Sequence, residues 1–455
     1  MNLDDASHEQ RRRRALRHGF GSGLVVRGVS LLLTFAAVPI ATSALGQAQY
    51  GAFALIAGLA TLLPFSDLGL GNGLVTALGQ ASGRDDDQEA RRLVSAALFG
   101  LVVVAAALLV IFVVVSWLVD WSRILGLGSE PFASDVDSAT ELFGVLFIAA
   151  MPFTIGMRVL QGLQRTHVAN YWQLLTAPLV LVGYLVVRGA DGGLIAFTAV
   201  AGSVPLLVGI LCTVWVLARH AGLRPQRRAL EIVTTRRLMR LGGLFLVLTV
   251  AVAVAFETDS LVLSWVLGPS SVAVYSVSFR LFALVSLVAS LAFAPLWPAF
   301  AESLSRGDVA WTKRTVRRSV VWGGALSLPA AALLVLVAGP FIRWWVGDSF
   351  VPPLSLSVGL AVWVVLGATQ MPIVMLLNGA GVVRFQVVAA SLMAVSNLLL
   401  SIWLAHGIGV AGPVWGSVIA HTLCSGIPMV VFVRRHFRWR VDRPGGLVDD
   451  SAVPA

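Results

Sequence analysis

Charged residues are scarce in this chain, and cysteine is scarcer still. Only 12% of the 455 residues are Asp, Glu, Lys or Arg, whereas 57% are hydrophobic, and the mean hydropathy is +0.86. A water-soluble fold of this size could not bury so much apolar surface, so the composition excludes a soluble globular protein. The two cysteines, Cys212 and Cys424, both fall in long apolar stretches. They cannot link loops and are interpreted as small buried hydrophobic residues.

The sequence also lacks the motifs of common enzymes. It has no glycine-rich Walker loop for ATP, no His and Cys cluster with metal-ligand spacing, and no nucleophile elbow. The longest segment expected on the outer side, residues 119–138, is too short for a folded catalytic domain. We therefore predict a transporter rather than an enzyme. We expect no metal and no cofactor other than a coupling ion, either a proton or sodium.

Twelve long apolar stretches are present instead. About 20 apolar residues are enough to cross a hydrocarbon core of roughly 30 Å as a helix. The expected spans are 20–45, 50–79, 93–118, 139–160, 168–188, 193–218, 242–266, 272–300, 319–342, 354–378, 384–405 and 410–433. The sequence therefore predicts an all-α integral membrane protein with about 12 transmembrane helices.

Basic residues lie mainly on one side of these spans. Of the 33 Lys and Arg residues, 28 fall in the amino tail, the carboxyl tail and five connecting loops. The opposite side holds only Arg123, Arg188 and Arg343. This asymmetry predicts that both termini lie in the cytoplasm and that the number of membrane-spanning helices is even. It also accounts for the formal net charge of +10 without a nucleic-acid partner, and the basic tails would attract anionic membrane lipids.

The chain repeats itself in two halves. Leu45-Gly46 corresponds to Leu267-Gly268 at an offset of 222 residues, and Leu160-Gln161-Gly162 corresponds to Leu377-Asn378-Gly379 at an offset of 217. Six helices per half give both halves the same orientation, which predicts a pseudo-symmetry axis along the membrane normal and a substrate path between the lobes. The expected parts are a basic tail (1–19), an amino-terminal lobe (20–218), a basic linker (219–241), a carboxyl-terminal lobe (242–433) and a cytoplasmic tail (434–455). The linker is expected to be either a surface helix or a simple basic connection.

Short motifs along the chain follow the pattern of a known family. They are Pro39, Leu45-Gly46, Tyr50-Gly51, Ser66-Asp67-Leu68-Gly69-Leu70, Leu160-Gln161-Gly162-Leu163-Gln164-Arg165, Asp259, Leu267-Gly268, Tyr275, Pro295 and Leu377-Asn378-Gly379. This pattern covers essentially the whole chain and resembles the polysaccharide-unit (O-antigen-type) flippases. Those flippases share a superfamily with multidrug and toxin extrusion transporters and with peptidoglycan-precursor flippases. The motifs consist of common residues, so they indicate the family better than the substrate.

The resemblance implies a V-shaped pair of six-helix lobes around a solvated, cationic cavity. It also implies alternating access that moves an undecaprenyl-pyrophosphate-linked oligosaccharide across the membrane, for lipopolysaccharide or exopolysaccharide, beside a glycan polymerase and export machinery. The peptidoglycan branch usually has fourteen helices, which this chain does not. The drug-extrusion branch tends to have an acidic and proline pattern in its first helix, where this chain has no carboxylate.

Three arginines are candidates for binding the lipid pyrophosphate. An ionised side chain near the bilayer centre costs roughly 2.5–3.5 kcal/mol, so such residues usually face a cavity or a partner. Arg27 and Arg280 fall inside spans, and Arg158 lies at the cytoplasmic end of the fourth span. A guanidinium group binds phosphate oxygens through two parallel donors. The alternatives are structural ion pairs, snorkelling of Arg27, and a plain topological role for Arg158.

Three carboxylates also fall in spans: Asp67, Glu257 and Asp259. Each could bind the coupling ion or balance an arginine in the cavity. Glu257 and Asp259 are two residues apart and point about 200° away from each other on a helix, so only one can face the cavity squarely. The alternative for Asp67 is to hold the irregular, glycine-rich backbone that follows it.

Neutral polar residues near the lobe interior are candidates for sugar contacts. They are Asn72, Asn170, Tyr171, Gln370, Asn378 and Asn397. At such depth, amides more often join helices by hydrogen bonds, which is the alternative interpretation.

We predict a flippase for lipid-linked oligosaccharide repeat units, driven by an ion gradient. Two other functions are considered. A multidrug or small-molecule cation antiporter of the same superfamily would favour an acidic cavity over an arginine-bearing one. A membrane-embedded glycan polymerase or ligase would need a sizeable outward loop.

Overall fold

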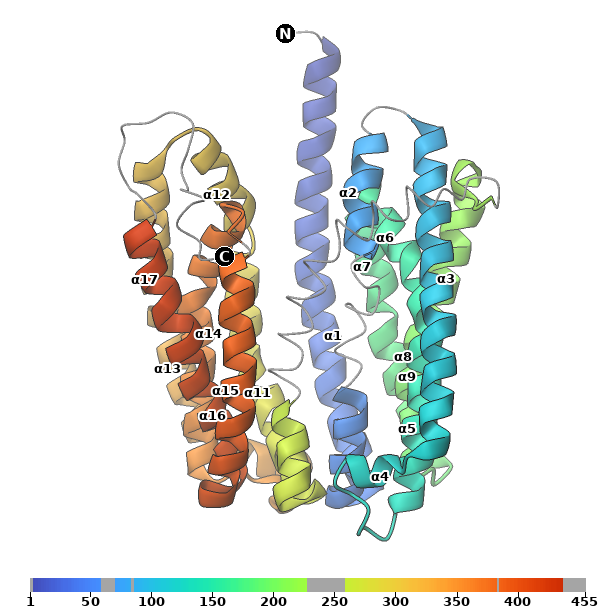
Figure 1. Cartoon of the computed structure of the whole chain (residues 1–455), viewed down its shortest axis with the longest axis vertical. Helices are drawn as coiled ribbons and strands as arrows, with labels where there is room; N and C mark the ends of the chain where they lie inside the picture. The colour runs from blue at the N-terminus through green and yellow to red at the C-terminus, as the bar shows by residue number, and fades with distance from the viewer. Residues whose placement is uncertain (1–2, 59–69, 83–85, 227–257, 383, 437–455) are drawn as a thin grey trace. The chain divides into compact units, whose positions relative to one another are not determined.

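The computed structural model describes residues 3–58, 70–82, 86–226, 258–382 and 384–436, and within these ranges every regular element is a helix (Figure 1). Nine of the described helices are long and apolar enough to cross a membrane, and a shorter apolar helix covers Thr258–Leu267. The chain divides into two compact units, unit 1 (residues 1–249) and unit 2 (residues 250–455). Each unit is described by itself.

Unit 1 is a bundle around the helix α9. Its elements are α1 (Leu3–Gly58), α2 (Leu70–Ser82), α3 (Asp87–Leu118), α4 (Trp121–Ile124), α5 (Ala133–Ala150), the 3-10 turn η2 (Met151–Thr154), α6 (Ile155–Gly162), α7 (Thr166–Leu174), α8 (Thr176–Gly189), α9 (Leu194–Arg219) and the 3-10 turn η3 (Ala221–Leu223). α9 packs against α1, α5, α6 and α8. The predicted amino tail is helical from Leu3 as part of α1. Most of the predicted linker lies outside the described residues.

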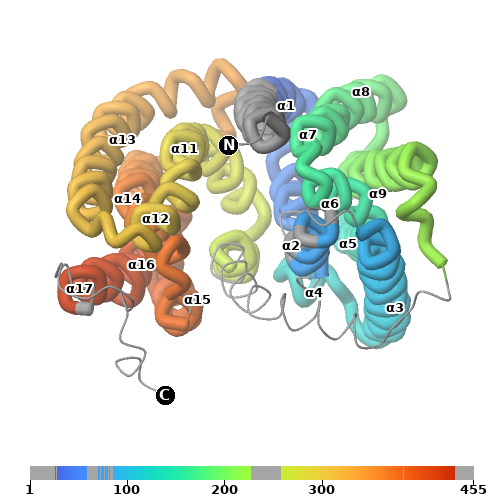
Figure 2. The backbone as a smooth tube through the Cα atoms, turned by 90° about the horizontal axis from the view of Figure 1, so that it is seen from above, coloured from blue at the N-terminus to red at the C-terminus, as the bar shows by residue number. Residues whose placement is uncertain are grey.

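Unit 2 is built around α14. Its elements after the Thr258–Leu267 helix are α11 (Pro269–Phe293), α12 (Leu296–Ser305), α13 (Val309–Val346), the 3-10 turn η5 (Asp348–Phe350), α14 (Leu354–Gly379), α15 (Arg384–Ile408), the 3-10 turn η6 (Gly409–Ala411), α16 (Gly412–His421), the π-helical turn η7 (Thr422–Gly426) and α17 (Ile427–His436). α14 packs against α11, α12, α13 and α16 (Figure 2).

Glycine produces the same backbone break in both halves of the repeat. Gly46 has φ +70° and ψ 178°, and it interrupts α1 where the first two predicted spans meet. Gly268 has φ +84° and ψ 176° and separates the Thr258–Leu267 helix from α11. Only glycine adopts this combination of angles without strain, because it has no Cβ atom. The two Leu-Gly motifs are therefore equivalent in backbone as well as in sequence.

The second pair of motifs supplies equivalent packing contacts. A Cβ atom on Gly162 of α6 would lie 3.0 Å from the Leu78 side chain of α2. A Cβ atom on Gly379 of α14 would lie 2.9 Å from the backbone nitrogen of Ala301 in α12. In each unit the glycine thus lets a helix end pack closely on its neighbour. Large apolar side chains elsewhere, such as Leu336 and Trp403, remain exposed on the helices, as expected for surfaces that face lipid.

Replacing Gly379 by alanine should destabilise unit 2, because the added methyl group meets backbone atoms that cannot rotate away. Overpacking of this kind costs about 1–3 kcal/mol. We expect a lower apparent Tm for Gly379→Ala in a thermal unfolding experiment on the purified protein.

Gly407→Ala is the matched control, because Gly407 lies in α15 with open space around the position of a Cβ atom. It should leave the Tm unchanged or raise it slightly. Equal Tm values for the two variants would contradict the close α12–α14 contact.

Candidate functional site

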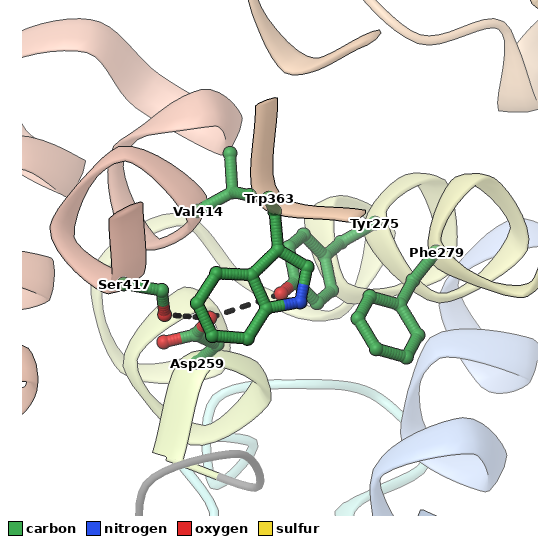
Figure 3. Close-up of a pocket in the computed structure, with 6 residues that line it drawn as sticks. All are labelled: Asp259, Tyr275, Phe279, Trp363, Val414 and Ser417. Atoms are coloured by element: carbon green, nitrogen blue, oxygen red, sulfur yellow. Dashed lines mark hydrogen bonds between the residues drawn. The ribbon is translucent and has the colours of Figure 1, made fainter. Parts of the chain in front are cut away.

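Asp259 is the centre of a buried polar cluster in unit 2. Only 3% of its surface is exposed, and four side chains donate hydrogen bonds to its carboxylate. Tyr275 Oη and Ser417 Oγ lie 3.0 and 2.9 Å from Oδ2, and Asn397 Nδ2 and Ser401 Oγ each lie 3.2 Å from Oδ1. Figure 3 shows the hydroxyl groups of Tyr275 and Ser417, which donate to Oδ2, pointing at the carboxylate. We call these five residues the Asp259 site.

Local sequence explains how four elements converge on the Asp259 site. Asn397 and Ser401 are four residues apart, so they lie on one face of α15. α16 approaches that face closely because Gly416 has no side chain: a Cβ atom there would lie 2.8 Å from the Ser401 nitrogen. Tyr275 reaches the site from α11, two turns after the break at Gly268. Close helix packing through small residues is typical of membrane proteins, and it brings the hydroxyl groups within bonding distance.

The carboxylate is held by neutral groups alone. Within the described part of the chain, no Lys, Arg or His forms an ion pair with Asp259. The side-chain oxygen of Asn397, Oδ1, lies 3.0 Å from the Ser417 hydroxyl and 3.1 Å from the Ser401 hydroxyl, so the single proton of each serine can point at the carboxylate or at this amide oxygen. The Pro413 carbonyl lies 3.4 Å from the Ser401 hydroxyl. Oxygen atoms therefore dominate the site. Such a set can hold a proton on the carboxyl group or a small hard cation among the oxygens.

A small pocket opens beside the carboxylate. Its walls are Asp259, Tyr275, Phe279, Trp363, Val414 and Ser417 (Figure 3). The Phe279 ring stacks on the Tyr275 ring with centroids 5.9 Å apart. The pocket has room for about one water molecule or a small cation, and it is too small for a sugar. No group of three or more His, Cys, Asp or Glu side chains that could hold a metal ion occurs among the described residues.

The corresponding position in unit 1 is apolar. The offset of 222 residues that relates Gly46 to Gly268 pairs Asp259 with Ala37 and Tyr275 with Phe53. Phe53 is buried and packs on the rings of Tyr184 and Phe197, with centroids 5.9 and 6.4 Å away. The repeat has therefore kept its backbone pattern, whereas the carboxylate occurs only in unit 2.

Arg280 occupies the middle of α11, immediately after Phe279 of the pocket. Its side chain is half-buried, and among the described residues no carboxylate forms an ion pair with it. The structural ion pair considered from the sequence is thus not seen here. Arg280 lies five residues after Tyr275, or about 7.5 Å along the helix axis. One helix therefore contributes to the Asp259 site and presents an arginine at membrane depth.

Of the remaining charged candidates, the structure describes the side chain of one and not those of the other three. Arg158 is half-buried in α6 of unit 1. Asp67 and Glu257 lie outside the described residues, and so does the side chain of Arg27, although its backbone belongs to α1.

The predicted sugar contacts in unit 2 are engaged in helix-to-helix hydrogen bonds. Gln370 of α14 donates to the Ser425 hydroxyl at 2.9 Å, and the Asn378 carbonyl oxygen accepts from Gln386 at 3.0 Å. Asn397 belongs to the Asp259 site. These contacts are the alternative role expected of amides in a membrane.

In unit 1, Tyr171 of α7 is exposed and its ring packs on His167. Asn170 precedes it in the same helix, and the Asn72 side chain lies outside the described ones.

Sequence analysis missed Ser401 and Ser417 and noted Tyr275 only as part of a motif. A weak signal for Ser401 existed, because it follows Asn397 by four residues and so lies on the same face of a predicted helix. Ser417 had no comparable signal, since its partner is 158 residues away.

Comparison with known proteins identifies the family. The family of polysaccharide biosynthesis proteins matches residues 16–304. The uncharacterized membrane protein EpsK of Bacillus subtilis (strain 168) is 26% identical over 206 residues, which cover 44% of this chain and 39% of EpsK. The matched region thus spans less than half of that curated relative.

Solved structures share the fold. An inward-facing multidrug resistance MATE family transporter of the MOP superfamily has a TM-score of 0.73 and 14% identity, with 90% of this chain and 94% of that chain covered. A MOP superfamily transporter from Pyrococcus furiosus, described as having a binding pocket of reversed polarity, has a TM-score of 0.64 and 13% identity, with 92% and 95% covered. At these identities the likeness shows the fold alone, and it confirms the predicted all-α membrane fold of twelve helices in two lobes.

The family match covers more than half of the chain, and the fold is that of MOP-superfamily transporters. The chain therefore belongs to the family of polysaccharide biosynthesis proteins.

Proposed function

We propose that this protein translocates undecaprenyl-pyrophosphate-linked oligosaccharide repeat units across the bacterial cytoplasmic membrane, by alternating access coupled to a proton or sodium gradient. One observation carries the proposal: α11 presents Arg280, which forms no ion pair with any described carboxylate, and it also contributes Tyr275 to the Asp259 site. An anion-binding group and a cation-binding group are thereby joined by one rigid element. Family membership supports a polysaccharide pathway, in which a glycan polymerase and export machinery are the proposed partners. The distribution of basic residues supports both termini in the cytoplasm.

Arg280 is the group best suited to the anionic part of the substrate. A half-buried guanidinium at membrane depth needs a counter-charge, and the described part of unit 2 provides no carboxylate for it. A pyrophosphate offers pairs of oxygens that match the two parallel donors of the guanidinium group. The lipid carrier would supply that pyrophosphate, whatever sugars are attached.

Asp259 is the group best suited to the driving ion. Its carboxylate accepts four hydrogen bonds, three of them from hydroxyl groups that can also accept. When the carboxyl group is protonated, one oxygen becomes a donor, so a hydroxyl group facing it must reverse or move. A bound cation requires the same change, because the hydroxyl oxygens must then point lone pairs at the ion. If Tyr275 is the hydroxyl group that moves when Asp259 binds a proton or a cation, then α11 moves with it. Arg280, which lies on the same helix, is then displaced as well.

A drug or cation antiporter is the rival function within the same fold. The MATE transporters that share the fold are only 14–16% identical to this chain, so the likeness does not extend to a substrate. A cationic drug would require an acidic cavity, whereas α11 presents Arg280. The arginine therefore favours an anionic substrate.

Replacing Asp259 by asparagine should uncouple transport from the ion gradient, because the asparagine amide neither carries a charge nor binds a proton near neutral pH. Coupling free energies between two sites are typically about 1–3 kcal/mol, so gradient-stimulated flipping should fall by about 5- to 150-fold. The measurement is translocation of lipid-linked oligosaccharide in proteoliposomes, with and without imposed proton and sodium gradients.

Asp348→Asn serves as the control, because Asp348 is an exposed carboxylate that pairs only with Arg343 at the surface. It should transport as the wild type does. A coupling role for Asp259 is ruled out if Asp259→Asn keeps the full response to both gradients at a normal protein level.

Replacing Arg280 by glutamine should weaken binding of the carrier lipid. A hydrogen bond to a charged group contributes about 1.5–3 kcal/mol, so affinity for undecaprenyl pyrophosphate without sugars should fall roughly ten- to a hundredfold. Arg280→Lys should fall between glutamine and the wild type, because lysine keeps the charge and loses the paired donors. Binding is measured on the purified protein in nanodiscs, and export by the surface polysaccharide of a complemented deletion strain.

Arg306→Gln is the matched control, since Arg306 is exposed and pairs with Glu302 at the end of α12. It should bind and export normally. Normal binding and export by Arg280→Gln would remove Arg280 from the substrate site.

A further inference from the structure

His421 is a second titratable group in the interior of unit 2 that the proposed function does not use. It ends α16, one helical turn after Ser417 of the Asp259 site. Its Nε2 atom is buried and has no hydrogen-bond partner among the residues that the structure describes. A buried nitrogen without a partner costs about 1–3 kcal/mol, so the position requires an explanation.

Trp363 connects His421 to the Asp259 pocket. The indole ring forms a wall of that pocket (Figure 3), and the His421 ring packs edge-on against it with centroids 5.2 Å apart and an interplanar angle of 72°. Ser417 and His421 are four residues apart, so their side chains lie on one face of α16, with Cβ atoms about 6 Å apart. Asp259, Trp363 and His421 therefore form a continuous path through the unit.

The backbone changes directly after His421. Residues Thr422–Gly426 form a π-helical turn, in which the Ile427 nitrogen donates to the Thr422 carbonyl. Such turns shift the register of later side chains and occur frequently at functional sites. His421 is thus the last residue of α16 that keeps the helical register of Ser417.

Few other titratable groups come near this path. α14 carries no ionisable side chain, and on α16 His421 is the only one. The titratable or charged groups on the elements that pack around α16 and the π-turn are Asp259, Tyr275, Arg280, Arg384, His406, Cys424, Arg434, Arg435 and His436. Arg384 and His406 lie toward opposite ends of α15. The last three residues of α17 are Arg434, Arg435 and His436. The Cys424 thiol donates a hydrogen bond to the Ser396 hydroxyl. Among the described residues on these elements, Asp259 is therefore the carboxylate with which His421 can exchange charge.

We propose that His421 is a second station for the coupling proton and takes up the proton that Asp259 releases. The proton leaves the Asp259 carboxyl group, passes by way of the Ser417 hydroxyl and a water molecule, and binds the Nε2 lone pair of His421. The products are a carboxylate and an imidazolium, and the reverse transfer restores the neutral pair. This inference rests on the proposed coupling at Asp259, and it identifies the driving ion as a proton.

The test follows the charge of His421 without any glycan. Trp363 is the reporter, because a positive charge on a ring 5.2 Å away changes its resonance. The full chain is labelled with 5-fluorotryptophan, placed in nanodiscs and titrated from about pH 3 to 9 by fluorine NMR, with Trp363 assigned from Trp363→Phe. We expect a titration step in the Trp363 signal of the wild type.

Two variants must remove this step: His421→Gln, which keeps a polar group, and His421→Phe, which keeps a ring against Trp363. Asp259→Asn should retain the step but move its midpoint to lower pH by about half a unit or more, because the carboxylate no longer favours the imidazolium. His406→Gln should change nothing, since His406 is exposed and its Nδ1 atom lies 2.8 Å from the Ile402 carbonyl.

Absence of a step in the wild type, its survival in either His421 variant, or an unmoved midpoint in Asp259→Asn would each overturn the inference. Those results would leave the flippase function standing, because sodium could still drive it. Conversely, a coupled titration together with full transport by Asp259→Asn would support the proton path and contradict the proposed use of Asp259 in transport.

Discussion

A buried carboxylate with no cationic partner among the residues that the structure describes is the constraint on which the rest of unit 2 depends. Asp259 can exist there only because four neutral donors from three other helices reach it. Those donors require α15 and α16 to pack closely, which in turn requires Gly416 beside Ser401. The glycine at the α11 entrance, Gly268, sets the start of the helix that delivers Tyr275. Packing and polar chemistry are thus inseparable in this unit.

The internal repeat clarifies which of these features belong to the fold and which to the site. Glycines with positive φ break the backbone at equivalent places in both halves, and the glycines at the ends of α6 and α14 make equivalent contacts. The interior differs, because an aromatic cluster of Phe53, Tyr184 and Phe197 fills unit 1. A scaffold can therefore be duplicated while a charge is introduced into one copy. At this position of the repeat, the described residues place a buried carboxylate in unit 2 and apolar side chains in unit 1.

The sequence was sufficient for the fold because apolar length and glycine position are local signals. The predicted spans that fall on described residues agree with the described helices, whereas most of the span 242–266 lies outside them. The sequence also singled out Asp259, whose role in ion coupling stays a prediction. The partners of Asp259 could not be predicted, since Ser401 and Ser417 are 142 and 158 residues away and serine is common in membrane helices. The roles of Gln370 and Asn378 were also open, because an amide bonds a sugar or a neighbouring helix with the same groups. Only packing distinguishes these cases, and here the amides join helices.

The neutrality of the donors around Asp259 has a consequence for mechanism. An arginine or lysine in the place of Ser417 would hold the carboxylate charged throughout, because a cation cannot become an acceptor. Hydroxyl groups can donate to a carboxylate and accept from a carboxylic acid, so the same network tolerates both charge states. Since Tyr275 belongs to this network and shares α11 with Arg280, occupancy of the ion site and of the phosphate site must affect each other equally if the helix responds to either. A membrane transporter that moved its substrate passively would have no need of a carboxylate that can change its charge at this depth.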